Sequence, residues 1–162
     1  MSASSHTLAT ESLRLALRQW CEALDALRIT VQEDQPAPGE LALADRMADD
    51  TDEVIGWLSE ASAGLDGAND FSDAHRLVGR ALRKQGESLF GCVRQIHLEQ
   101  LARGADLRWR AWVSAVRSAL EPLWLRSEDV VTRLAFPFPP PASMAPPRVD
   151  PFQDRMTLNQ SN

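Results

Sequence analysis

Histidines and carboxylates are the residues of this chain best suited to metal chemistry, but their spacing does not assemble a metal site. A di-metal centre inside a helical bundle requires Glu-x-x-His pairs on facing helices. Neither His75 nor His97 has a glutamate three residues before it. Glu99 follows His97 by two residues, which places the two side chains on different faces of a helix. We therefore expect no metal and no cofactor at these residues.

Acidic residues are densest in residues 45–53 (DRMADDTDE), which lack the glycine and the ligand order of a calcium-binding loop. We interpret this segment as the solvated face of a helix. A glycine-rich phosphate loop, a Cys-x-x-Cys motif and a nucleophile-elbow motif are also absent from the sequence. These absences favour a protein that is not an enzyme.

One histidine motif nevertheless has a known counterpart. The segment at residues 74–79 (AHRLVG) resembles the core of histidine-phosphotransfer domains, helical bundles with the pattern Ala-His-x-Leu-Lys-Gly. The resemblance implies that His75 is an exposed phospho-acceptor. Val78 replaces the family's lysine, and Gly86 is displaced by one residue from the family's later glycine. The apolar stripe Phe71, His75 and Val78 instead predicts a partly buried, structural histidine.

Basic residues form a single patch, made of Arg76, Arg80 and Arg83 with Lys84 and Arg94. A net charge of −6 argues against general nucleic-acid binding, which requires many cations to neutralise phosphates. We expect this patch to contact an acidic partner protein or the acidic segment of this chain. Folding the intervening turn about residue 68 would bring Glu53 near Arg83.

Three tryptophans, Trp57, Trp112 and Trp124, flank the apolar stripes described below. We interpret them as a wide core. The alternative is an interface, because tryptophan is enriched at binding hot spots and an exposed cluster would require a partner.

The two cysteines, Cys21 and Cys92, lie far apart in the chain. Their number favours free, buried thiols in a reducing compartment. The first ten residues have neither a basic start nor an apolar core, so we predict no signal peptide. No stretch approaches the roughly 20 apolar residues of a membrane span. These features predict a cytoplasmic protein.

The element that must position all these residues is the α-helix. The chain has 162 residues, no tyrosine, and much alanine, leucine, arginine and glutamate, a balance that favours helix over sheet. Apolar residues recur at alternating steps of three and four in four segments. The clearest stripe is Leu13, Leu17, Trp20, Leu24, Leu27 and Val31. The stripe of the third segment is Val78, Leu82, Gln85, Leu89, Cys92 and Ile96.

These stripes predict an antiparallel, up-down-up-down four-helix bundle over residues 7–134, after a disordered N-terminus at residues 1–6. The expected helices cover residues 7–32, 40–64, 72–103 and 106–134. Pro122 should kink the fourth helix, although the capping-box spacing of Ser118 and Glu121 leaves a two-helix interpretation open. Gly79, Gly86 and Gly91 should allow a neighbouring backbone to approach the third helix closely.

Residues 135–162 differ in composition from the bundle. Their run FPFPPP (residues 136–141) favours an extended polyproline II conformation. Because such a segment loses little entropy on binding, we expect it to dock on a partner through four anchors. These anchors are Phe136, Phe138, Phe152 and Met156.

The sequence thus predicts an all-α, non-enzymatic protein-interaction module: an adaptor, a chaperone-like protein or an assembly subunit. Its partners would be one or more proteins, including a second copy of itself. The first alternative is a histidine-phosphotransfer-like signalling bundle that uses His75. A further alternative is an acidic helical protein that neutralises a toxin or coats a granule.

Overall fold

The computed structural model describes residues 2–33, 42–67 and 70–136. Within these ranges the chain forms four helices and no strand. They are α1 (Ser2–Glu33), α2 (Ala42–Ala63), α3 (Ser72–Arg103) and α4 (Leu107–Ala135). The prediction of an all-α, four-helix fold is confirmed for the described part of the chain.

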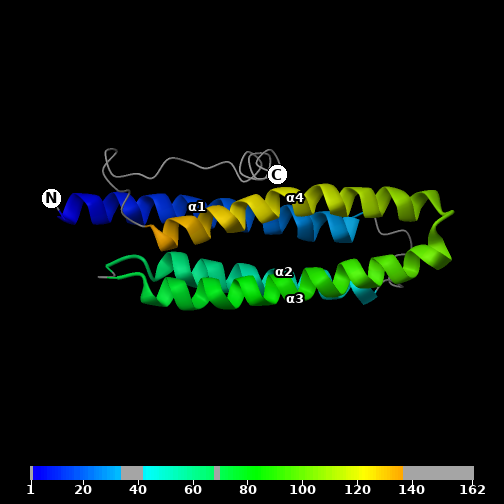
Figure 1. Ribbon diagram of the computed structural model, residues 1–162, viewed down its shortest axis with the longest axis horizontal. Helices are drawn as coiled ribbons and strands as arrows, with labels where there is room; N and C mark the ends of the chain where they lie inside the picture. Colours follow the sequence, from blue (N-terminus) through cyan, green and yellow to red (C-terminus); the bar gives the residue numbers. More distant parts are fainter. Residues whose placement is uncertain (1, 34–41, 68–69, 137–162) are drawn as a thin grey trace, which may run out of the picture.

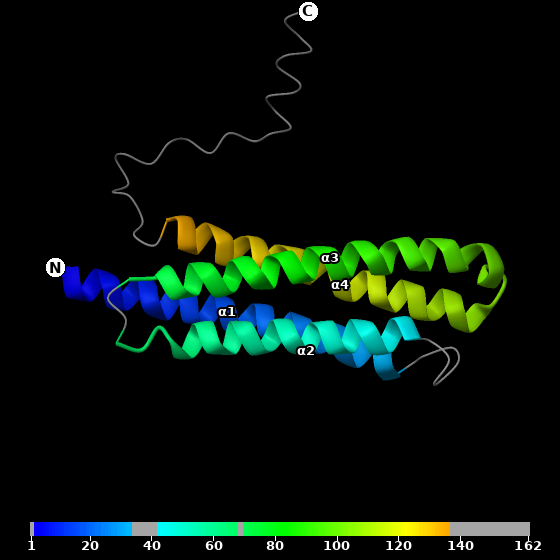
Figure 2. The same ribbon diagram turned by 90° about the horizontal axis from the view of Figure 1, so that it is seen from below.

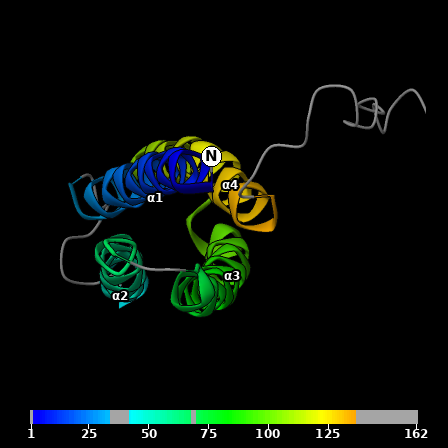
Figure 3. The same cartoon turned by 90° about the vertical axis from the view of Figure 1, so that its left-hand side faces the viewer.

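The helices lie side by side along one long axis, and the chain reverses direction between successive helices (Figures 1 and 2). Seen end-on, they occupy the four corners of a bundle (Figure 3). The backbone of α1 closely approaches α2 and α4, and that of α2 closely approaches α3. The α3 and α4 backbones come close at only a few positions. The turn between α3 and α4 extends beyond the ends of α1 and α2.

Helix α1 begins at Ser2, so the expected disordered N-terminus at residues 1–6 is helical from Ser2 onward. Tertiary contacts explain the difference. The ring of His6 stacks on that of Phe71, with the centroids 5.5 Å apart. Ala9 and Thr10 are buried as well. These contacts attach the first turns of α1 to the rest of the bundle.

Helix α4 has a defined beginning and passes through Pro122 without a break. The carboxylate of Asp106 accepts a hydrogen bond from the backbone N–H of Arg108 at 2.9 Å, which satisfies a donor that the first helical turn leaves free. Because α4 is continuous from Leu107 to Ala135, the alternative of two shorter helices, suggested by the capping-box spacing of Ser118 and Glu121, is wrong.

The core consists of the predicted stripes. The α1 stripe from Leu13 to Val31 is almost completely buried, and the stripes of the other helices meet it. One polar pair lies among these apolar residues. The indole N–H of Trp20 donates to Oε1 of Gln85 at 2.8 Å, so both buried polar groups are satisfied.

The interior glycines of α3 do not have the expected role. A Cβ atom added at Gly79, Gly86 or Gly91 would meet nothing within 4 Å in the described chain. No helix of the bundle therefore uses the space that these glycines leave.

Replacing Gly79 or Gly86 by alanine should stabilise the isolated protein by about 0.5–1 kcal/mol each, because glycine loses more backbone entropy in a helix than alanine does. Urea unfolding followed by far-UV circular dichroism measures the gain. Gly67→Ala is the control, and we expect it to lower the free energy of unfolding. The φ of Gly67 is 73°, a backbone conformation that glycine adopts more readily than alanine. A loss of stability at Gly86 would show that a neighbour occupies that space.

Candidate interaction surface

His75 is exposed, so the prediction of a partly buried histidine is wrong. The stripe that placed it inward was extended back to Phe71, one residue before the expected helix. Phe71 instead caps the helix with a non-helical backbone, and α3 begins one residue later. Ala74 and Val78 face the core, which turns His75 outward. Val78, which occupies the position of the lysine in phosphotransfer domains, is therefore buried.

Chemistry-bearing residues are dispersed over the part of the chain that the structure describes. No three of its histidines, cysteines, aspartates and glutamates are placed to hold a metal ion together. Cys21 is half-buried and Cys92 is buried, and both thiols are free. Burial raises the pKa of both thiols above the ordinary value, which lowers the fraction of reactive thiolate at neutral pH.

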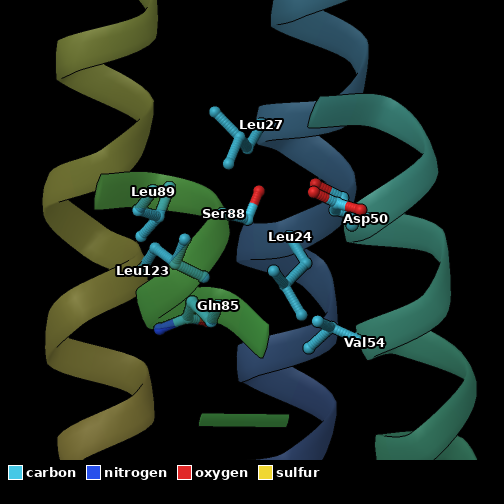
Figure 4. A pocket seen from close by; sticks show the side chains of 9 residues that line it. Leu24, Leu27, Asp50, Val54, Gln85, Ser88, Leu89 and Leu123 are labelled. Atoms are coloured by element: carbon cyan, nitrogen blue, oxygen red, sulfur yellow. The ribbon is translucent and has the colours of Figure 1, made fainter. Parts of the chain in front are cut away.

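A small, partly open crevice lies in the middle of the bundle, where all four helices contribute side chains (Figure 4). Leu24 comes from α1, Val54 from α2, Gln85 from α3 and Leu123 from α4. Its volume is about 10 Å³. A single water molecule needs about that much space, so this crevice is too small for a substrate.

The acidic and basic faces of α2 and α3 meet at one lysine. Nζ of Lys84 lies 3.5 Å from Asp50 and 3.4 Å from Glu53. The charge of Asp50 is the largest cause that raises the pKa of Lys84, followed by Glu53. The expected neighbour of Glu53 was Arg83, so the register differs by one residue.

The other arginines of the predicted patch remain on the surface. Arg76, Arg80 and Arg83 are exposed. Within the described ranges only Arg76 has an ion-pair partner, Asp73 of the same helix, at 3.9 Å. Arg80 and Arg83 are therefore available to a partner.

The three tryptophans have different environments. Trp112 is buried, and its indole N–H donates to the backbone oxygen of Val31 at 3.3 Å, so it belongs to the core and not to an interface. Trp57 is half-buried against the core. Trp124 is 51% exposed. Only Trp124 thus offers a large aromatic surface to a partner.

Exposed apolar side chains gather on α3 and α4. α2 has no exposed large apolar residue, and α1 has a few scattered ones, whereas α3 and α4 carry most of them. Those on α3 and α4 are Phe90, Val93, Leu98, Leu101, Leu107, Trp124, Leu125 and Val131. Contiguous exposed apolar surface is the usual mark of an interaction site.

Phe90 and Val93 were missed by the stripe analysis because they lie one position after the core residues Leu89 and Cys92. A search for a second apolar row beside the core stripe would have found them. Of the predicted tail anchors, Phe136 is exposed at the end of α4. Phe138, Phe152 and Met156 lie outside the described residues.

None of the described helices combines the length with the apolar character needed to cross a membrane. Comparison with protein-family models, with curated proteins and with solved structures finds no match to this chain.

Proposed function

We propose that this chain is a non-enzymatic protein-interaction module, such as an adaptor, a chaperone-like protein or an assembly subunit. In this proposal an up-down-up-down bundle presents a rigid surface, and an extended C-terminal tail over residues 135–162 is a second docking element. The observation that supports the proposal best is the apolar surface on α3 and α4. Exposing Phe90 and Trp124 to water is unfavourable, and a partner that covers them would remove that penalty.

Rigidity of the bundle also supports this role. Three of its helix pairs are closely packed, and the buried Trp20–Gln85 hydrogen bond fixes α1 against α3. A preorganised surface loses little entropy on binding, which favours affinity.

The proposal is tested by affinity purification of the tagged full-length protein from its native cell, with quantitative mass spectrometry. The baits are the wild type, Phe90→Asp and a chain truncated after Phe136. Sedimentation of the same three proteins measures self-association. We expect at least one protein to be retained by the wild type and lost with one of the changes. Identical retention by all three baits, without self-association, would contradict an interaction role.

Truncation after Phe136 should leave the bundle intact. The described helices end at Ala135, and their core contacts lie within the bundle. We therefore expect the same helical circular dichroism signal in absolute terms and an unchanged urea midpoint. Loss of helical signal or of stability would show that residues 137–162 are part of the folded domain.

A second candidate function is phosphotransfer, and the exposure of His75 favours it. Gly79 stands four residues later and leaves the space beside the imidazole open. Incubation with phosphoramidate as phosphodonor, followed by mass spectrometry under alkaline conditions, tests this function. Wild type should gain one phosphoryl group and His75→Gln should gain none; equal labelling of both would exclude His75 as the acceptor.

A further inference from the structure

The seam between α3 and α4 is the open side of the bundle. The other three neighbouring helix pairs pack closely along their length, whereas α3 and α4 do not. A groove of about 100 Å³ lies in this seam, with Val93 and His97 on one wall and Val116 and Leu120 on the other. We refer to the seam, from Gly79 to Gln100 on α3, as the α3/α4 groove.

The α3 wall has the seven-residue periodicity of a coiled-coil seam. Val93 and Gln100 line the groove. Steps of seven residues back from Val93 reach Gly86 and Gly79, which therefore lie on the same face of α3. Phe90 borders this row and is 75% exposed. This face has no side chain at Gly79 and Gly86, and it is apolar at Phe90 and Val93.

The α4 wall continues the apolar surface. Leu120 lines the groove, and steps of three or four residues lead from it to Trp124, Ser127 and Val131 on the same face. Trp124 and Val131 are exposed. Both walls thus expose apolar side chains to the same seam.

Gly79 and Gly86 indicate that the groove accepts an element whose backbone packs closely against α3. Each glycine lowers the stability of α3, and nothing in the described chain fills the space beside it. Glycines that repeat along a helix face allow a second helix to approach closely. From Gly79 to Gln100 the groove spans about 32 Å at 1.5 Å per residue, the length of about three heptads of helix.

Charge specifies the occupant further. Arg110 and Arg117 line the half of the seam nearest the α3–α4 turn, opposite Gln100 of α3. Within the described residues neither arginine has a carboxylate partner; Nε of Arg110 donates to the backbone oxygen of Gly104 at 2.7 Å, and Glu99 pairs with Arg103. This half of the groove therefore carries unpaired positive charge beside apolar surface.

These observations favour a helix of another protein as the occupant, rather than a second copy of this chain or its own residues 137–162. A symmetric dimer with parallel helices across the seam would bring the arginines of two copies together, and an antiparallel one would set them against the glycine half of α3, which has no acidic row. The α2 helix of a second copy is acidic but exposes no large apolar residue. Residues 137–162 contain equal numbers of acids and bases, so they lack the complementary charge.

We propose that the α3/α4 groove binds an amphipathic α-helix of a partner protein, with an apolar stripe of heptad spacing and acidic flanks. The apolar stripe packs on Phe90, Val93 and Trp124. Its acidic residues pair with Arg110 and Arg117. This inference rests on the proposed interaction function and names the partner's chemistry.

Fluorescence anisotropy of labelled synthetic helices tests the proposal with the full chain. Three peptides of about 21 residues share one apolar heptad stripe and carry glutamate, glutamine or lysine at the flanking positions. We expect the glutamate peptide to bind saturably, and at least about tenfold more tightly than the lysine peptide, with an affinity that falls as salt rises.

Gly86→Leu is the decisive variant, because a Cβ atom at this position meets nothing within 4 Å in the described chain and the larger side chain would occupy the space left for a partner helix. We expect unchanged or higher stability and at least a tenfold loss of affinity for the glutamate peptide. Gly56→Leu, the same substitution at an exposed glycine of α2 where an added Cβ also meets nothing within 4 Å, is the matched control and should bind normally. Equal binding by Gly86→Leu and wild type would overturn the proposal.

Other occupants would appear as distinct outcomes. Competition by a peptide of residues 137–162, or a dimer that Gly86→Leu dissociates, would overturn the proposal in favour of this chain's own tail or a second copy. If affinity purification retains a partner that depends on the tail but not on Gly86, the groove proposal fails while the interaction function stands. If no partner is retained and no peptide binds, both fail.

Discussion

Replacing Trp20 by alanine should lower the free energy of unfolding by about 3–5 kcal/mol, because this side chain is completely buried and its removal leaves a large cavity. A domain of this size is stable by only about 5–15 kcal/mol. The variant should therefore unfold at a much lower urea concentration than the wild type, as measured by circular dichroism.

The hydrogen bond from Trp20 to Gln85 can be separated from the packing by a double-mutant cycle. Trp20→Phe keeps an aromatic ring but leaves the buried Gln85 amide without its donor. Gln85→Met keeps the volume but leaves the indole N–H without its acceptor. Each single variant should lose about 1–3 kcal/mol from the unsatisfied group, in addition to any packing loss.

The double variant Trp20→Phe/Gln85→Met should be more stable than the sum of the single losses predicts, because neither polar group then remains buried without a partner. Strict additivity would mean that the 2.8 Å contact contributes nothing specific to the core. Such a result would also weaken the argument that α1 is fixed against α3 by this pair.

This pair illustrates what the sequence could predict. The three-four spacing placed both Trp20 and Gln85 on core stripes, and both are buried. It could not reveal that they meet, because 65 residues separate them and the contact depends on how α1 and α3 are rotated about their axes. Helix identity follows from local periodicity, whereas side-chain pairing follows from tertiary packing.

The candidate site was less predictable for the same reason. An apolar stripe identifies the face that a helix buries, but Phe90 and Val93 lie beside that face and become a surface only because α4 leaves the seam open. The glycines of α3 suggested a close neighbour, but not that the neighbour is absent from the described chain. His75 was placed inward because the apolar stripe was extended back to Phe71, which precedes α3 and has a non-helical backbone.

Trp109→Ala should also cost about 3–5 kcal/mol, since Trp109 is fully buried and its contacts hold the turn between α3 and α4 together. Its indole N–H donates to Oε1 of Gln100 at 2.7 Å, and the guanidinium carbon of Arg103 lies 5.8 Å from its ring centroid. The Trp112 ring is 5.4 Å away. Removing Trp109 thus deprives the turn of hydrogen bonding, cation–π attraction and aromatic packing at once.

Trp124→Ala is the matched control, because it is the same substitution on the same helix at a half-exposed position. Its stability loss should be below about 1 kcal/mol, in line with other surface substitutions. Urea unfolding compares the two variants, and hydrogen exchange of the Arg108 and Trp109 amides reports on the turn. Similar stability losses in both variants would contradict the assignment of Trp109 to the core and of Trp124 to the surface.

Peptide binding gives a second comparison of the two tryptophans, because only Trp124→Ala should lose affinity without losing stability. Trp124→Ala removes an apolar contact from the groove wall, so affinity for the acidic helix should fall while the fold remains intact. Trp109→Ala should loosen the turn that holds the two walls of the groove, so this variant should lose both stability and affinity for the peptide. A Trp124→Ala protein that binds normally would remove α4 from the proposed interface, because Trp124 is the largest exposed side chain on that wall.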